Sequence, residues 1–393
     1  MRLSSSLVFY IGNGVVKAAV VVHEKSKLPR IISTRVRDLP HFEERDRDHL
    51  EKRILFEFGE MVREFKSEDV KKLATTNNIN GASYNLKFDN AFVLVSSPWY
   101  ISETSIIKMR EQKPFLVTDA LIGNSQQQII KAYSDAHKLD VTVLEQKIIN
   151  ILLNGYPTND PIKKRAETLD MTVFTSFARK SSIDRIRDVI DTNFHVHDIS
   201  IHSQSLVSFS VISDTWHDET QYIIADVTSQ LTELVAIRKG ALSEAYSFPK
   251  GKQFLMRAIA EKLKVASEVA ESLIRMKNEG TIEPELNTKL DLALESAKKE
   301  WLKSFSDSLA VMSASSSLPS KFFLFAPKDV VHIFSEYITC EEYQQFSFAE
   351  GKFQVQHIGV SDLLPYCKIE NGATGDLSLM IGAIFNTKMK SII

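Results

Sequence analysis

The sequence has little cysteine, and its two thiols, Cys340 and Cys367, show no spacing typical of a metal-binding pair. A disulfide framework and a structural zinc site are therefore not expected, and a reducing compartment suits the chain. No uncharged apolar run approaches the length of a membrane span, so we expect no transmembrane segment. The N-terminal stretch carries Lys17 and His23 and lacks a small-residue cleavage site, so it does not resemble a signal peptide.

Strong charge of one sign is also missing. The formal net charge is −2 over 393 residues, which gives no overall attraction to nucleic acid or to anionic lipid. The sequence has no G-x-S-x-G nucleophile motif and no Walker loop, so hydrolase and P-loop functions lack support. Apolar residues make up 44% and charged residues 25%, as in a globular protein with a sizeable core.

A Gly-x-Gly turn near the N-terminus interrupts an apolar run. Gly12, Asn13 and Gly14 form this turn, and Lys17 follows it. Glycine has no Cβ, so the tip of such a hairpin lets a phosphate group approach the backbone closely. These four residues are candidates for binding a phosphate.

A second hairpin of similar plan follows in the other half of the chain. A β-rich run from Tyr222 ends at Asp226, and a small polar turn with Thr228 and Ser229 leads through Thr232 into the next strand. The hydroxyl groups of this turn are candidates for hydrogen bonds to a phosphate, and Asp226 is a candidate for holding the water shell of a metal ion.

Strand and helix patterns alternate along most of the chain, which predicts an α/β fold. Strands are expected at Leu7–Ile11, Val15–Val22, Arg30–Val36, Phe92–Ser96, Ser105–Arg110, Val141–Leu153, Leu169–Phe177, Val196–Ile201 and Lys321–Ala326. Helices are expected at Asp48–Leu73, Thr118–Ala136, Ser181–Asn193, Glu285–Ser313 and Leu377–Phe385, with Thr118 as an N-cap.

The two hairpins and the order of these elements resemble the actin-like ATPases, a superfamily that includes actin, heat-shock chaperones, sugar kinases, FtsA and PilM. The resemblance implies an actin-like (ribonuclease H-like) fold in which two domains enclose a cleft. The first domain is expected from 1–100, 195–215 and 376–393, and the second from 216–375. An α+β subdomain is expected between them, at 101–194, on the side of the first domain and away from the cleft.

This insert narrows the resemblance to two branches. The division protein FtsA carries a strand–helix–strand–strand unit here, and its central strand runs into a polar turn. The segments Lys147–Tyr156 and Asn159–Lys164 resemble that element, although Lys163 stands where the family often has glycine. The pilus assembly protein PilM has a related insert.

The resemblance also implies a nucleotide site. Lys17, Asp226 and Thr232 would converge on the cleft, and Glu271 lies in a helical segment similar to the one that touches adenosine. Tyr10 occupies the position of an acidic residue that organises the metal, and Pro327 lies in the segment that replaces the adenine platform. We therefore expect ATP with Mg²⁺ not to bind tightly, and we expect a degenerate ATPase rather than an efficient enzyme.

The function implied first is that of an FtsA-like cytoplasmic adaptor that links division filaments to membrane partners. The alternatives are a PilM-like component of a pilus or secretion machine, which binds the cytoplasmic tail of a membrane protein, and an active ATPase. Both adaptor readings predict an apolar patch on the insert or at a subdomain edge, and some self-association. The protein is expected in the cytoplasm, held at the inner face of the membrane through its partners.

Overall fold

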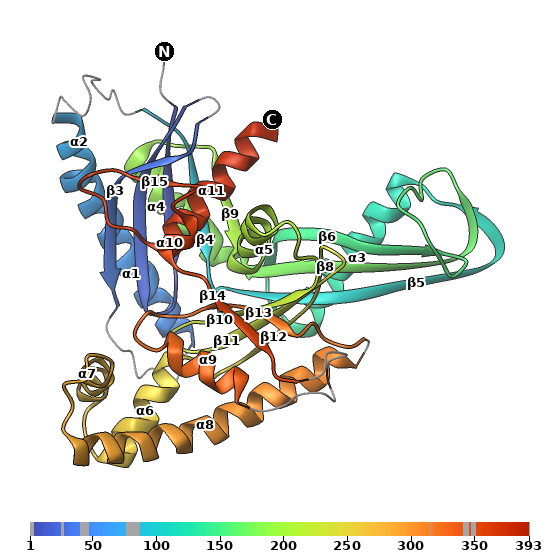
Figure 1. Ribbon diagram of the computed structural model, residues 1–393. Coiled ribbons are helices and arrows are strands. Elements are labelled where there is room, and N and C mark those ends of the chain that lie inside the picture. Colours follow the sequence, from blue (N-terminus) through green and yellow to red (C-terminus); the bar gives the residue numbers. More distant parts are fainter. Residues whose placement is uncertain are drawn as a thin grey trace.

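A computed structural model describes residues 4–24, 27–39, 47–75, 87–314, 316–340, 346 and 351–392. Its strands form three sheets, and each sheet belongs to a different part of the molecule (Figure 1). Both predicted hairpins are present, one in each of the two central sheets. None of the helices in these ranges has the length and hydrophobicity that a membrane span requires.

The first sheet has the strand order β15-β3-β2-β1-β4-β9. Its strands are β1 (Ser4–Ile11), β2 (Val15–His23), β3 (Arg30–Asp38), β4 (Phe88–Val95), β9 (Ile199–Ser203) and β15 (Lys368–Ile369). Alternation along β1 explains how this sheet is covered on both faces. Leu7, Phe9 and Ile11 face one apolar cluster, whereas Val8 faces another on the opposite side.

Helices cover both faces of this sheet. One face carries α1 (Arg47–Glu64), the π-helical η1 (Phe65–Val70), α2 (Lys71–Thr75) and α4 (Lys180–Phe194). The other carries α5 (Gln204–Thr215), α10 (Val360–Leu363) and α11 (Leu377–Ile392). The helix expected at Asp48–Leu73 is therefore three consecutive helical segments, because a π-helical turn interrupts the α-helical hydrogen bonding.

The second sheet has the order β12-β11-β10-β13-β14. Its strands are β10 (Tyr222–Val227), β11 (Thr232–Arg238), β12 (Ala241–Phe248), β13 (Lys321–Phe325) and β14 (Gln354–His357). One face packs on α6 (Lys252–Leu263), α7 (Ser267–Asn278), α8 (Pro284–Ser313) and α9 (Val331–Thr339). The other face shares an apolar cluster with α5 and α11, so these two helices join the two domains.

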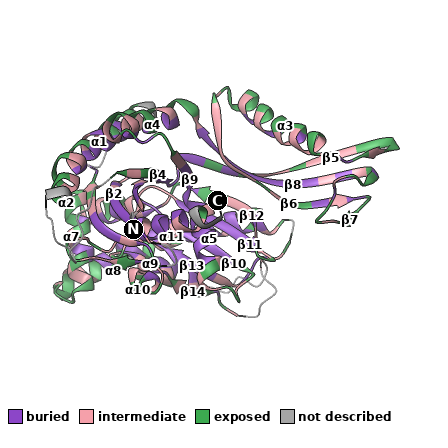
Figure 2. Ribbon diagram, turned by 90° about the horizontal axis from the view of Figure 1, so that it is seen from above, coloured by how far each residue is buried: buried purple, intermediate pink, exposed green. Residues whose placement is uncertain are grey.

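The insert is a sheet of three long strands and one two-residue strand in the order β5-β8-β6-β7, with a helix packed against it. Its elements are β5 (Tyr100–Leu116), α3 (Asp119–His137), β6 (Val141–Leu153), β7 (Tyr156–Pro157) and β8 (Arg165–Arg179). The predicted N-cap of α3 is confirmed, because the Thr118 side chain accepts a hydrogen bond from the Leu121 N–H at 3.1 Å. Figure 2 shows exposed residues along α3 and the outer part of β5, in contrast to the buried central sheets.

The placement of the insert differs from the expectation in two respects. Its strands project away from the body of the molecule (Figure 1), and it contacts the second domain as well as the first. The Thr104 hydroxyl donates to the Ser243 carbonyl of β12 at 2.6 Å. The insert does not close over the cleft as a lid, since none of the residues that line the cleft belongs to it.

Two segments that the resemblance assigned to the insert and to the second domain pack on the first domain instead. The expected insert range 101–194 includes α4, whose Ile183 and Ile186 pack in the same cluster as α1. The expected second-domain range 216–375 includes β15, which pairs with β3 of the first sheet. In both places the apolar side chains or the strand hydrogen bonds find their partners in the first domain.

Candidate functional site

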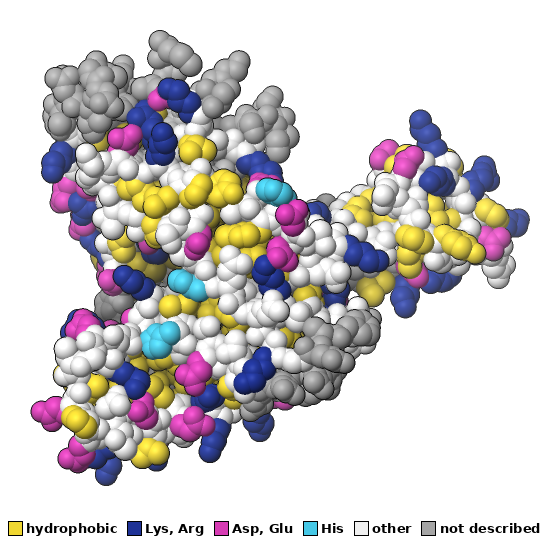
Figure 3. All heavy atoms as spheres, viewed as in Figure 1, with side chains coloured by type: hydrophobic (Ala, Val, Ile, Leu, Met, Phe, Trp, Pro, Cys, Tyr) yellow, Lys and Arg dark blue, Asp and Glu magenta, His cyan; other side chains and the backbone are white. Residues whose placement is uncertain are grey.

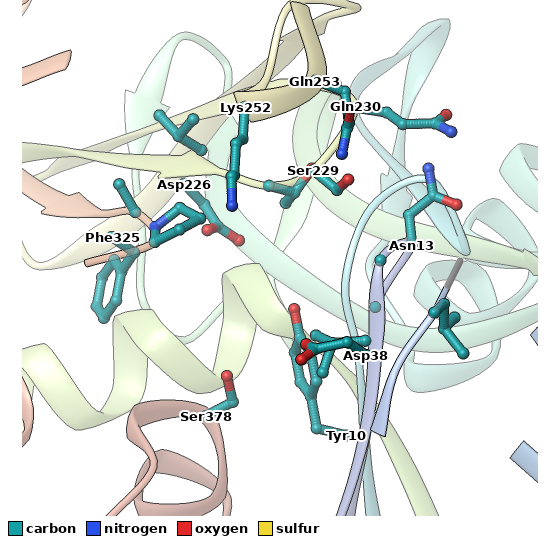
Figure 4. A pocket seen from close by; sticks show the side chains of 18 of the residues that line it. Tyr10, Asn13, Asp38, Asp226, Ser229, Gln230, Lys252, Gln253, Phe325 and Ser378 are labelled. Atoms are coloured by element: carbon teal, nitrogen blue, oxygen red, sulfur yellow. The ribbon is translucent and has the colours of Figure 1, made fainter. Parts of the chain in front are cut away.

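A cleft of about 420 Å³ lies between the turns of the two hairpins. Strands of both central sheets end at this cleft, and so do the first residues of α6 and α11 (Figure 4). Eight of the nine residues predicted to bind a nucleotide line it: Gly12, Asn13, Gly14, Lys17, Asp226, Thr228, Ser229 and Glu271. Their role in nucleotide binding stays a prediction, but the sequence did predict that they lie together.

Thr232 does not line the cleft. It is fully buried in the second domain, and its hydroxyl donates to the Lys250 carbonyl at 2.8 Å. The Trp301 ring N–H donates to the same carbonyl at 3.2 Å. The expectation that Thr232 converges on the cleft with Lys17 and Asp226 is wrong, because the strand alternation of β11 turns its side chain into the core.

The turns of the two hairpins touch each other across the cleft. A Cβ atom built on Gly14 would lie 2.9 Å from the Ser229 hydroxyl and 3.0 Å from its Cβ atom. The two turns therefore leave no space between Gly14 and Ser229 for a phosphate group. The absence of glycine from the second turn accounts for this, because the Ser229 side chain fills the gap.

The second turn is also tied by its carbonyl groups to the start of α6. The N–H groups of Gly251, Lys252 and Gln253 donate to the carbonyls of Gln230, Thr228 and Ser229, at 3.1, 3.0 and 2.8 Å. The free N–H groups of a helix N-terminus commonly bind anions. In α6 these three groups are already used within the protein.

Lys17 forms an ion pair within the protein, so its ammonium group is not left exposed for a phosphate. Its Nζ lies 2.7 Å from Oδ2 of Asp376 and 3.3 Å from the Ser378 hydroxyl. The other carboxylate oxygen of Asp376 accepts from the Leu379 N–H at 3.1 Å, at the start of α11. The lysine therefore links the first hairpin to α11.

Tyr10 lies on the floor of the cleft with its ring against the first turn. A Cβ atom on Gly12 would meet the Tyr10 ring at 2.9 Å, and Nζ of Lys17 lies 4.9 Å from the ring centroid. Burial, together with the negative charge of Asp226, raises the pKa of Tyr10, so the hydroxyl stays protonated. The position offers no carboxylate to a metal ion.

Two acidic residues face each other beneath the second turn. Asp226 of β10 is paired directly with Glu233 of β11. Burial, reinforced by the charge of Glu233, raises the pKa of Asp226 to about 8. Burial raises the pKa of Glu233 to about 7, although hydrogen bonds from Tyr100 and Ser205 oppose this shift.

Glu233 joins three parts of the molecule. The Tyr100 hydroxyl, at the start of the insert, donates to its carboxylate at 2.6 Å. The same hydroxyl lies 2.6 Å from the Ser205 hydroxyl of α5 and accepts from the Ser205 N–H at 3.2 Å. Sequence reasoning missed Glu233, although the hairpin register, read outward from the turn, would have paired it with Asp226.

Glu271 lines the cleft as predicted, but it is paired there with a lysine. Nζ of Lys252 lies 3.2 Å from Glu271 and 2.9 Å from Asp329. Lys252 thus connects α6 with α7 and with the segment that follows Pro327. Both lysines of the cleft lining are therefore held by carboxylates.

No cluster of three or more metal-ligating side chains occurs among the residues that the structure describes. Two histidines that could have been metal ligands have structural roles instead. His195 ends α4 in a left-handed conformation, and the ring of His202 stacks on the ring of Phe92, with 5.5 Å between the ring centroids. Asp226 is the acidic residue that the resemblance assigned to a magnesium site. Its carboxylate neighbour across the hairpin is Glu233, and Tyr10 stands where the resemblance places the acidic residue of the first hairpin.

No known family model matches this sequence, and no curated protein matches it significantly. Solved structures do match. A PilM–PilN type IV pilus biogenesis complex aligns with a TM-score of 0.63 at 10% identity, over 98% of this chain and 99% of that chain. The ethanolamine utilization protein EutJ from Carboxydothermus hydrogenoformans gives a TM-score of 0.46 at 10% identity, over 97% and 89% of the two chains.

A Bacteroides thetaiotaomicron protein with an actin-like ATPase fold gives a TM-score of 0.42 at 10% identity, over 98% of this chain and 96% of that chain. Scores below 0.5 add little to the comparison. The chain has the actin-like ATPase fold, with two domains around a cleft, as the sequence predicted. At this identity the likeness concerns the fold alone.

The packing of α6 on the second turn predicts that Gly251→Ala is destabilising. The new Cβ atom would lie 2.4 Å from the Thr228 carbonyl oxygen and 2.7 Å from the Leu231 nitrogen. Because both are backbone atoms, we expect a loss of about 1–3 kcal/mol in urea unfolding followed by tryptophan fluorescence. Gly123→Ala is the control, since its Cβ meets nothing within 4 Å and should stabilise α3. Equal effects of the two substitutions would contradict this packing.

The raised pKa of Asp226 predicts a pH-dependent stability. Its pKa rises from 3.8 in the unfolded chain to about 8 in the folded protein, so the folded state binds the proton more tightly. The free energy of unfolding therefore falls as the pH rises through this window. We expect Asp226→Asn to raise the thermal midpoint by roughly 2–5 °C at pH 8 and by less at pH 5. The exposed Asp160→Asn serves as control, and a gain that is the same at both pH values would refute the assignment.

Proposed function

We propose that this actin-fold protein is a PilM-like assembly adaptor, which binds the cytoplasmic tail of a membrane protein and does not turn over ATP. It would thereby act at the inner face of a membrane as part of a pilus or secretion machine. The match to the PilM–PilN complex, which spans nearly all of both chains, supports this choice. In that complex PilM is bound to PilN, and we propose that the present chain also has a protein partner.

The observation that carries the proposal is the outer edge of the insert. β5 is an edge strand of its sheet and is 17 residues long. Three of its large apolar side chains are exposed: Ile101, Ile106 and Leu116. Figure 3 shows hydrophobic side chains gathered on the projecting insert. Long edge strands that expose apolar side chains are sites for pairing with another chain.

A groove along this edge defines what it would bind. The groove lies between β5 and α3 and has a volume of about 370 Å³. Ile106 of β5 and Ile129 and Tyr133 of α3 line it. An extended peptide would form backbone hydrogen bonds with β5 and place alternate apolar side chains in the groove. An apolar patch on the insert is what we expect of an adaptor, and this groove is our candidate for it.

The cleft supports the proposal that the protein does not turn over ATP. The two turns touch, the N–H groups at the start of α6 are used, and both lysines are ion-paired. A triphosphate would have to separate these contacts before it could bind. Phosphoryl transfer also needs a metal ion to neutralise developing charge, and Tyr10 does not supply the carboxylate that would help to hold one.

The division adaptor remains a second proposal, because the sequence resemblance extends to FtsA through the same insert. The two proposals differ in the partner. A division adaptor binds the tail of the filament protein, whereas a PilM-like adaptor binds the tail of a pilus or secretion membrane protein. The same edge of the insert would serve either tail.

Partner binding predicts that Ile106→Asp weakens the complex. The probes are fluorescent peptides for the cytoplasmic tails of membrane proteins encoded beside this chain, and for the tail of the division filament protein. An aspartate at this exposed edge position would remove apolar contact with the peptide and place a charge against its apolar side chains, so we expect a roughly tenfold weaker Kd in fluorescence anisotropy. Leu292→Asp on α8, at a position 61% exposed, is the matched control. The proposal fails if no tail binds, or if both variants bind alike.

The state of the cleft predicts weak or absent ATP binding. Calorimetry with ATP and Mg²⁺ should give no saturable heat, and phosphate release should stay at the background rate. Tyr10→Asp should restore little, because Ser229 still contacts Gly14 and Pro327 still offers no N–H group. Micromolar binding with steady turnover in the unmodified protein would revive the active ATPase.

A further inference from the structure

Buried amide groups without partners line the cleft. Asn13 is 6% exposed and Gln204 is 5% exposed. Neither polar atom of the Asn13 side chain has a hydrogen-bond partner among the described residues, and the same holds for Oε1 of Gln204. The Oε1 atom of Gln253 is also buried and has no hydrogen-bond partner among the described residues. Leaving such groups unpaired costs free energy, so their common location indicates a place where a polar ligand binds.

The unpaired groups are mainly hydrogen-bond acceptors. The Gln204 amide nitrogen donates to the Ser208 hydroxyl at 2.9 Å, so the oxygen is the unpaired atom of this amide. Figure 4 shows the amides of Asn13, Gln230 and Gln253 gathered at one end of the cleft. A ligand that satisfies these oxygens must supply N–H or O–H donors.

The charges of the lining favour the same kind of ligand. Lys17 and Lys252 are both ion-paired, as described above. Asp38 and Asp226 also line the cleft, and neither forms an ion pair with any residue that the structure describes. Neither lysine of the lining is therefore free to meet a phosphate, and once Asp226 ionises, near pH 8, the two carboxylates favour a cation.

We propose that the cleft binds a small organic cation with several N–H donors, in place of a nucleotide. The ammonium or guanidinium group would lie against Asp226 and Asp38, and the remaining donors would reach the oxygens of Asn13, Gln204 and Gln253. A cavity of about 420 Å³ accommodates a molecule of this size. The proposal deepens the proposed function, since it rests on a cleft that does not serve ATP turnover.

Asp226 makes this binding depend on pH. The charged and titratable groups that act on it are Glu233 of β11, Lys17 of β2, Tyr10 of β1 and Tyr100 of β5, and Lys252 of α6 points toward it in Figure 4. Without a ligand the pKa of Asp226 is about 8 because of burial and Glu233. A bound cation favours the ionised carboxylate, so affinity should rise with pH up to about 8 and then level off.

Calorimetry with agmatine and with spermidine tests the proposal, and adenosine and ATP with Mg²⁺ are the comparison ligands. Agmatine carries a guanidinium group and spermidine only ammonium groups, so the two titrations distinguish these chemistries. We expect saturable binding of at least one cation, roughly tenfold tighter at pH 8.5 than at pH 6.5. Asp226→Asn should weaken binding about tenfold at pH 8.5 and reduce the pH dependence to the part that Glu233 contributes, whereas Asp160→Asn should change neither.

The proposal is overturned if neither cation binds, if adenosine or ATP binds more tightly than both, or if Asp226→Asn binds the cation as well as the unmodified protein does. Anisotropy with the tail peptides is measured on the same Asp226→Asn protein. Retained tail binding shows that the variant is folded and that the adaptor function stands apart from the cation site. Ile106→Asp should lose tail binding and still bind the cation, so the two functions can fail separately.

Discussion

The contact between the two hairpin turns is the constraint on which the rest of this cleft depends. Gly14 and Ser229 meet where phosphate groups would pass between the domains, and the hydrogen bonds from the start of α6 hold the second turn in that position. Lys17 forms an ion pair with Asp376, which connects the first hairpin to the start of α11. Groups that suit a phosphate site are thus used for contacts within the protein.

The actin-like fold also offers a surface for binding outside the cleft. Its rigid central sheets carry the insert, whose long edge strand projects from the body of the molecule (Figure 1). Glu233, Tyr100 and Ser205 connect that insert to both domains through buried hydrogen bonds. These hydrogen bonds fix the base of the insert beside Glu233, the residue that pairs with Asp226 in the second hairpin.

Local sequence features predicted a large part of this structure. The glycine turn, the cap at Thr118 and the apolar alternation of the strands depend on neighbouring residues, and the two hairpins and α3 formed as expected. The missed features depend on residues far apart in the chain. Lys17 and Asp376 are separated by 359 positions, and nothing near either residue indicates the other. Thr232 was misplaced because its neighbours in the turn face the cleft while its own side chain faces the core.

A crystal structure of the protein grown with saturating ATP and Mg²⁺ tests the central claim most directly. The account predicts that the Gly14–Ser229 contact and the Lys17–Asp376 ion pair persist, with no phosphate density between the turns. Phosphate groups bound between separated turns, with Lys17 moved from Asp376 to the nucleotide, would contradict it.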